Sequence, residues 1–179
     1  MKKVLILSGS PRKGGNSDVL CDEFAKGALS KGNEVEKIFI SEQEIAPCKG
    51  CYYCAKHEGK CVIDDGMADI LQKIIDCDTL VLASPVYFYS VSAQLKAVID
   101  RTLARWTEIK NKDLFYIMTA AEEDSDTMDG TLACLRGFAK CIDGYEEKGV
   151  LYGKGVQKRG EVKYRPELMQ IAFEMGESV

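Results

Sequence analysis

Five short runs rich in apolar residues, separated by longer amphipathic segments, constrain the fold of this chain most strongly. The runs lie at residues 2–8, 34–40, 79–87, 113–120 and 149–153. An uninterrupted apolar run, as in the first of them, is typical of a strand buried on both faces of a sheet. Helical spacing of apolar residues marks the segments at 16–32, 64–77, 90–106, 127–144 and 165–176. This alternation predicts an α/β fold, an open parallel sheet with helices on both faces.

Handedness and length narrow the architecture further. Right-handed crossovers leave two strand orders for such a sheet, 2-1-3-4-5 and 3-2-1-4-5. In both, ligands bind at the carboxyl ends of the strands, near the point where the strand order reverses. A length of 179 residues indicates one domain with a core that needs no disulfides. We therefore expect a single domain over residues 1–179, with an irregular cysteine-rich loop at 47–63.

Charge and hydropathy exclude several classes of partner. The net charge is −4, so there is no basic surplus to neutralise nucleic acid phosphates. No apolar run is long enough to span a bilayer, and the N-terminal run is too short for the apolar region of a signal peptide. We expect a cytoplasmic protein that binds neither nucleic acid nor membrane. In a reducing cytosol, clustered cysteines are typical of metal or redox sites.

The segment "SGSPRKGGNS" between the first strand and the first helix predicts an anion site. Backbone N–H groups at a helix N-terminus attract anions. The side chains expected to contribute are Ser8, Ser10, Arg12, Lys13, Asn16 and Ser17. The segment lacks the Gly-Lys-Ser/Thr ending of a Walker A loop, and Pro11 breaks the spacing of a dinucleotide fingerprint. A monophosphate remains as the expected ligand; the alternative is a polar surface turn that binds nothing.

The segment after the third strand predicts a surface for a flat ligand. Pro85 cannot continue a hydrogen-bonded ladder, so the strand is expected to end near Ser84. Tyr87, Phe88 and Tyr89 then follow at the same edge of the sheet as the anion loop. A flat ligand would find aromatic faces and free backbone N–H groups there. The alternative is that these rings plug the core.

Half of the eight cysteines lie in one short segment, with the spacing Cys-x2-Cys-x2-Cys-x6-Cys. They are Cys48, Cys51, Cys54 and Cys61. Thiolates at this spacing suit a [4Fe–4S] cluster better than zinc, whose sites usually pair two knuckles over a longer span. Free thiols, a redox-active disulfide and zinc stay open, because the number of thiolates does not separate them. Small buried hydrophobes are expected at Cys21, Cys77, Cys134 and Cys141.

Two pairs of charged residues are expected to have structural roles. Asp64 and Asp65 lie at the start of the segment 64–77, just before its helical turns, where carboxylates cap N–H groups and favour the helix dipole. Asp100 and Arg101 lie late in the next predicted helix. By default they form a solvated ion pair.

The segments "SGSPRKGGNS" and "SPVYFYSVSAQLKAVIDR" together resemble the NAD(P)H-dependent FMN reductase family of flavodoxin-like proteins. The segment "CKGCYYCAKHEGKCVIDDGM" is similar to the iron–sulfur flavoprotein branch of that family. The resemblance covers about residues 1–120. It implies a flavodoxin-like three-layer sandwich whose five-stranded parallel sheet has the order 2-1-3-4-5.

The resemblance also implies FMN as cofactor and NAD(P)H as reductant. The FMN phosphate would bind Ser10, Arg12, Asn16 and Ser17, and the ring would lie against Pro85, Val86, Tyr87 and Phe88. A third cofactor loop would begin at Thr119. The four clustered cysteines would hold a [4Fe–4S] cluster, and the chain would form a homodimer or higher homo-oligomer.

Three functions are consistent with these features. In the first, FMN takes a hydride from NAD(P)H and passes electrons to a small-molecule or redox-protein acceptor; the cofactor carries the chemistry, so no catalytic side chain is expected. In the second, an iron–sulfur flavoprotein carries electrons between proteins. In the third, the thiols form a redox-sensing or zinc-binding module. A hydrolase is not indicated, since no Gly-x-Ser-x-Gly motif or triad is visible.

Overall fold

The sheet has the strand order that the family resemblance implied. The computed structural model describes the backbone of residues 1–179 and every side chain except that of Ser125. Five parallel strands are arranged in the order β2-β1-β3-β4-β5. Their bounds are Lys3–Ser8 (β1), Glu34–Phe39 (β2), Thr79–Pro85 (β3), Asp113–Thr119 (β4) and Glu146–Gly153 (β5). The flavodoxin-like fold and the order 2-1-3-4-5 are therefore confirmed.

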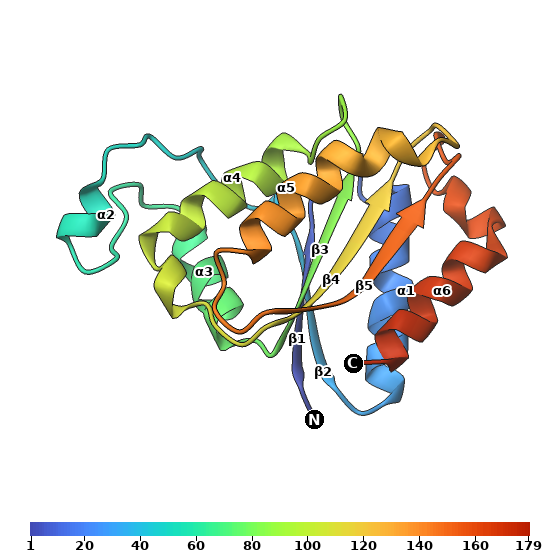
Figure 1. The fold of residues 1–179 in the computed structure, drawn as a ribbon, viewed down its shortest axis with the longest axis horizontal. Coiled ribbons are helices and arrows are strands. Elements are labelled where there is room, and N and C mark those ends of the chain that lie inside the picture. Colours follow the sequence, from blue (N-terminus) through green and yellow to red (C-terminus); the bar gives the residue numbers. More distant parts are fainter.

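Helices cover both faces of the sheet, as Figure 1 shows. Their bounds are Asn16–Ser30 (α1), Tyr53–Lys56 (α2), Met67–Asp76 (α3), Ala93–Arg101 (α4), Asp129–Ala139 (α5) and Pro166–Glu177 (α6). Short 3₁₀ turns lie at Ile40–Glu42 (η1), Thr102–Ala104 (η2), Trp106–Glu108 (η3), Ser125–Met128 (η4) and Glu161–Tyr164 (η5). None of the helices among the described residues has the length and apolar character needed to cross a bilayer.

Two apolar cores lie on opposite faces of the sheet. One packs α3, α4 and α5 against the strands, and the other packs α1 and α6 against the opposite face (Figure 1). In the second core, the Phe24 and Phe115 rings meet edge to face with their centroids 5.1 Å apart. The central strands β1, β3 and β4 are buried along nearly their whole length, which explains their continuous apolar runs.

The isolated cysteines divide between core and surface. Cys21 and Cys77 are buried, as expected; burial raises the pKa of both thiols, that of Cys77 to about 11. Cys134 is half-buried. For Cys141 the prediction of burial is wrong: it follows the end of α5 and is exposed, lining an apolar cavity of about 560 Å³.

The carboxyl ends of four strands meet at one edge of the sheet. In the strand register Ser8 lies beside Ala83, Pro85 beside Thr119, and Thr119 beside Gly153. The loops that follow β1, β3, β4 and β5 therefore converge. Strand β3 ends at Pro85, one residue beyond the expected position, and the next N–H group, that of Val86, donates to the Thr119 carbonyl at 2.8 Å.

Candidate functional site

A cavity of about 170 Å³ lies where these loops converge. Its lining brings together Ser10 and Arg12 of the first loop and Asn16 and Ser17 at the start of α1. The opposite wall includes Pro85 and Thr119 at the ends of β3 and β4, with Val86 and Tyr87 from the loop after β3. The volume is below the roughly 300–1,000 Å³ of a typical ligand pocket. The cavity therefore suits the polar end of a ligand, whose remainder would lie outside it.

The N-terminus of α1 presents unused donors to this cavity. Ser17 is 1% exposed, and its Oγ has no hydrogen-bond partner among the described residues. The first N–H groups of α1 have no acceptor within the helix. A Cβ atom on Gly15 would lie 2.8 Å from the Arg12 carbonyl oxygen, so only glycine lets the loop fold this tightly onto the helix. These donors fit the three acceptor oxygens of a phosphate.

Ser10 shapes the loop that carries Arg12. The Ser10 Oγ accepts a hydrogen bond from the Arg12 N–H at 3.1 Å and donates to the Arg12 carbonyl at 3.2 Å. This closed turn holds the Arg12 backbone against the cavity. The Arg12 side chain has no carboxylate partner among the described residues, so its charge is available to a ligand.

Three residues expected in the site do not line the cavity. The Ser8 Oγ donates to the Asp18 carboxylate at 3.1 Å, below the loop. The Lys13 ammonium pairs with Glu42 at 2.8 Å. Phe88 is fully exposed at the tip of its turn.

The aromatic turn after β3 differs from the expected surface in one respect. The N–H groups of Val86 and Tyr87 are already bonded, to Thr119 and Ser90 respectively, so they are not free for a ligand. Phe88 and Tyr89 have left-handed φ angles of 47° and 62°, which cost roughly 1–2 kcal/mol each. Tyr87, Phe88 and Tyr89 are exposed, so none plugs the core, and only Tyr87 lines the cavity.

One wall of the cavity comes from a segment that the sequence analysis did not connect with it. Residues 154–165, called here the strap, join β5 to α6 and contribute Val156, Gln157 and Arg159 to the lining. The Asn16 amide holds the strap: its Nδ2 donates to the Val156 and Lys158 carbonyls at 3.1 and 3.0 Å. The only sequence signal was a basic segment flanked by glycines, "GVQKRG", between a strand and a helix.

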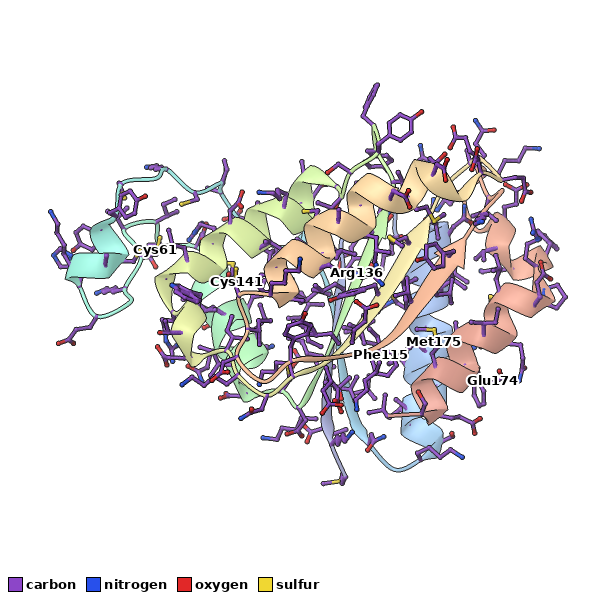
Figure 2. The ribbon with its side chains drawn as sticks, in the orientation of Figure 1. Cys61, Phe115, Arg136, Cys141, Glu174 and Met175 are labelled. Atoms are coloured by element: carbon purple, nitrogen blue, oxygen red, sulfur yellow. The ribbon has the colours of Figure 1, made fainter. Side chains whose placement is uncertain are left out.

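The cysteine loop projects from the body of the molecule, beside α3 and α4 (Figure 1). Cys48 and Cys51 are exposed, while Cys54 and Cys61 are half-buried. Figure 2 shows Cys61 on this loop, apart from Cys141 near the end of α5. Among the described residues no three cysteine, histidine or acidic side chains come together as a metal site. A cluster therefore does not fit the loop as it stands, and cluster ligation remains a prediction.

Arg101 fastens both ends of the cysteine loop to α4. Arg101 is 3% exposed, and its guanidinium donates to the Ala46 carbonyl at 2.7 Å, just before the loop. It also forms a two-pronged ion pair with the Asp65 carboxylate, just after the loop, at 2.8 and 2.9 Å. The pair with Asp100 predicted from the sequence is wrong, because Asp100 pairs instead with Lys96, one helical turn away.

Asp65 has a second role at the start of α3. Its carboxylate accepts hydrogen bonds from the N–H groups of Ala46 and Met67 at 2.9 and 3.1 Å. The contact with Met67 is the helix-capping role expected from the sequence. Hydrogen bonding by Arg101, followed by these backbone donors, holds the pKa of Asp65 below its ordinary value of 3.8.

Comparison with known proteins connects this site to a family. The model of a family described as NADPH-dependent FMN reductase matches residues 2–129. An iron-sulfur flavoprotein from Methanocaldococcus jannaschii is 46% identical over 100 residues, covering 56% of this chain and 51% of the relative. An iron-sulfur flavoprotein from Methanosarcina thermophila is 42% identical over 101 residues, covering 56% and 52%. The chain spans about half the length of the curated relatives it matches.

A solved structure shares the whole fold. The NAD(P)H:quinone oxidoreductase from Methanothermobacter marburgensis superposes with a TM-score of 0.73, covering 99% of this chain and 95% of the other. Its sequence identity is 16%, so this similarity concerns the fold alone. The strap and α6 lie within the superposed region, although they lie outside the residues matched by the family model.

Proposed function

Because the chain belongs to the NADPH-dependent FMN reductase family, we propose that it binds FMN and passes electrons from NAD(P)H through FMN to a small-molecule or protein acceptor. The observation that carries the proposal is the cavity where the buried Ser17 hydroxyl, the α1 N-terminus and Arg12 offer unused donors. When bound, FMN supplies the hydride and electron transfer chemistry. The side chains of the site bind and orient, and none has to act as acid or base.

Each part of the site has a separate task in this proposal. Arg12 and Ser17 bind the phosphate, Arg12 through a charge-assisted hydrogen bond. Pro85, Val86 and Tyr87 form the surface next to the flavin ring, with Tyr87 offering an aromatic face. Since the Val86 and Tyr87 N–H groups are occupied within the turn, this surface orients the ring by contact rather than by those donors.

Two further expectations are part of the proposal. We place the protein in the cytoplasm, which is consistent with its eight free cysteines. We also propose a homodimer or higher homo-oligomer. The support is the aromatic turn, where the fully exposed Phe88 stands beside the 65% exposed Tyr89. Contiguous exposed apolar side chains are typical of interaction surfaces.

An absorbance titration tests the central proposal. Purified protein should take up FMN, and NADPH or NADH should bleach the bound flavin under anaerobic conditions. The absence of uptake at saturating FMN would overturn the proposal.

Removing the Arg12 guanidinium should weaken FMN binding selectively. Arg12→Ala is expected to lose about 1.5–3 kcal/mol of binding free energy, the scale of a hydrogen bond to a charged group. Quenching of flavin fluorescence on binding measures the dissociation constant. Lys13→Ala is the matched control, because Lys13 is adjacent in sequence but pairs with Glu42 outside the cavity. Lys13→Ala should bind FMN as tightly as wild type. If Arg12→Ala also keeps the wild-type FMN dissociation constant, Arg12 does not bind the phosphate.

A second candidate function is electron transfer between proteins. Four thiols on one projecting loop favour it, as does the similarity to relatives named iron-sulfur flavoproteins. In that case NADPH and NADH would leave the bound flavin oxidised, whereas reduced ferredoxin would bleach it. The same anaerobic titration therefore separates the two candidates.

The cysteine loop and the flavin site should respond independently to mutation. No cysteine lines the described 170 Å³ cavity, so Cys51→Ser should leave the FMN dissociation constant unchanged. Any iron that the wild-type protein binds at the loop should be lost from the same variant. Flavin fluorescence and an iron assay measure the two effects. A loss of FMN binding in Cys51→Ser would mean that the loop helps to shape the flavin site.

A further inference from the structure

We propose that the strap completes the mononucleotide site and that Arg159 is a second cation that binds the phosphate. This inference rests on the proposed function. It concerns residues outside the segment 2–129 that matches the family model. It depends on how the strap is held, where the Arg159 guanidinium lies, and which charges are left without a partner.

The strap has a defined conformation over the first loop. Besides the two bonds from Asn16 Nδ2, the Asn16 Oδ1 accepts a hydrogen bond from the Val162 N–H at 3.1 Å. The Glu161 carboxylate accepts from the N–H groups of Gln157 and Lys158 at 2.7 and 2.8 Å. The residues between these contacts, including Arg159, are therefore closed into a turn that faces the start of α1.

The Arg159 guanidinium contacts the first loop, between β1 and α1. Its Nη2 donates to the Lys13 carbonyl, and Nη2 and Nε would lie 3.6 and 3.7 Å from a Cβ atom on Gly14. Arginine has five N–H donors, and the contact with Lys13 uses one of them. The other donors have no hydrogen-bond partner among the described residues, and Arg159 lines the cavity together with Arg12 and Ser17.

The two arginines at this cavity differ from the other arginines in having no carboxylate partner among the described residues. Of the six arginines, Arg101, Arg105, Arg136 and Arg165 each pair with a carboxylate. Arg12 and Arg159 have no such partner among the described residues, and both line the same cavity. Two cations at one small cavity repel each other unless an anion lies between them. A phosphate monoester, with a charge of about −1.5 to −2 at neutral pH, balances both.

We therefore expect the strap to contact the phosphate of the ligand and not its flavin ring. Riboflavin has the same ring and ribityl chain as FMN but lacks the phosphate. A residue that binds only the phosphate contributes to FMN affinity and leaves riboflavin affinity unchanged. A residue that merely shapes the fold changes both affinities together.

Arg159→Ala tests this inference with FMN and riboflavin as the two probes. The FMN dissociation constant should rise roughly 10–100-fold, as for the loss of a hydrogen bond to a charged group, while that of riboflavin stays constant. Arg159→Lys keeps the positive charge but loses the paired N–H donors of the guanidinium. Its FMN dissociation constant should therefore lie between those of wild type and Arg159→Ala. Arg165→Ala is the matched control, because this strap arginine pairs with Glu167 and does not line the cavity.

Each other outcome has a distinct meaning. If wild-type protein binds no FMN, the proposed function itself fails. If wild type binds FMN and Arg159→Ala binds it equally well, the inference about Arg159 is overturned while the proposed function stands. If Arg159→Ala weakens FMN and riboflavin to the same extent, the strap acts only on the shape of the site, and the inference is also overturned. Circular dichroism melting of each variant verifies that it is folded.

Discussion

Arg101→Met should lower the free energy of unfolding by about 3–5 kcal/mol, the usual cost of removing one partner from a buried ion pair. The variant leaves the Asp65 carboxylate, with a side chain only 9% exposed, without its counter-ion. It also leaves the Ala46 carbonyl without the Arg101 donor. Ala46 and Asp65 flank the cysteine loop and form what we call its stem. In the variant, this stem should be held less firmly against α4. Urea denaturation followed by circular dichroism measures the change.

Two variants separate the buried ion pair from a general effect of losing a charge. Arg136→Met removes an arginine whose pair with Glu147 is partly exposed, with side chains 48% and 27% exposed, so it should cost about 0–1 kcal/mol. In Arg101→Met combined with Asp65→Asn, no buried charge is left unpaired and the amide oxygen can still accept from a backbone N–H group, so part of the lost stability should return. If Arg101→Met and Arg136→Met lower the free energy of unfolding by the same small amount, the ion pair between Arg101 and Asp65 does not contribute the expected stability.

The same ion pair makes stability depend on pH in a defined direction. The folded-state pKa of Asp65 lies below its ordinary value of 3.8, chiefly because of hydrogen bonding by Arg101. A carboxyl group of this kind stabilises the fold fully above its unfolded pKa, and the contribution is lost as pH falls through the folded pKa. The stability difference between wild type and Arg101→Met should therefore narrow below pH 3.8. A constant difference would contradict the assignment.

The Arg101 pairing also shows where sequence reasoning reaches its limit. The strands and helices were predictable, because apolar periodicity is a local property and a parallel sheet brings its carboxyl ends to one edge. The partner of Arg101 was not. The sequence offered Asp100, but neighbouring residues on a helix do not face each other. The observed partner, Asp65, is 36 residues away and meets Arg101 only through the packing of α4 against the loop stem.

The lining of the 170 Å³ cavity was predictable only in part, for the same physical reason. The residues of the first loop lie close together in the sequence, so Arg12 and Ser17 could be identified as cavity residues from composition and position. Asn16 was expected to bind the phosphate, but its side chain reaches a carbonyl 140 residues later in the strap. An irregular segment such as the strap has no periodicity, so its place over the first loop depends on where the following helix, α6, packs.

That packing leads to the last prediction, for the contact between α1 and α6. A Cβ atom on Gly27 would lie 2.0 Å from the Phe173 carbonyl oxygen, and one on Gly176 would lie 2.0 Å from the Phe24 carbonyl oxygen. The two helices thus approach backbone to backbone at reciprocal glycines. Gly27→Ala should force them apart and cost about 1–3 kcal/mol, the typical penalty of overpacking. Urea denaturation again gives the free energy of unfolding.

Gly137→Ala provides the matched control. Gly137 lies inside α5 with no atom within 4 Å of a Cβ, so alanine there should stabilise the fold by about 0.5–1 kcal/mol. The two substitutions are chemically identical, but we expect changes of opposite sign. Because the strap leads directly into α6, Gly27→Ala should also displace Arg159 and weaken FMN binding, whereas Gly137→Ala should not. Matching responses of the two variants would mean that α6 does not hold the strap over the first loop.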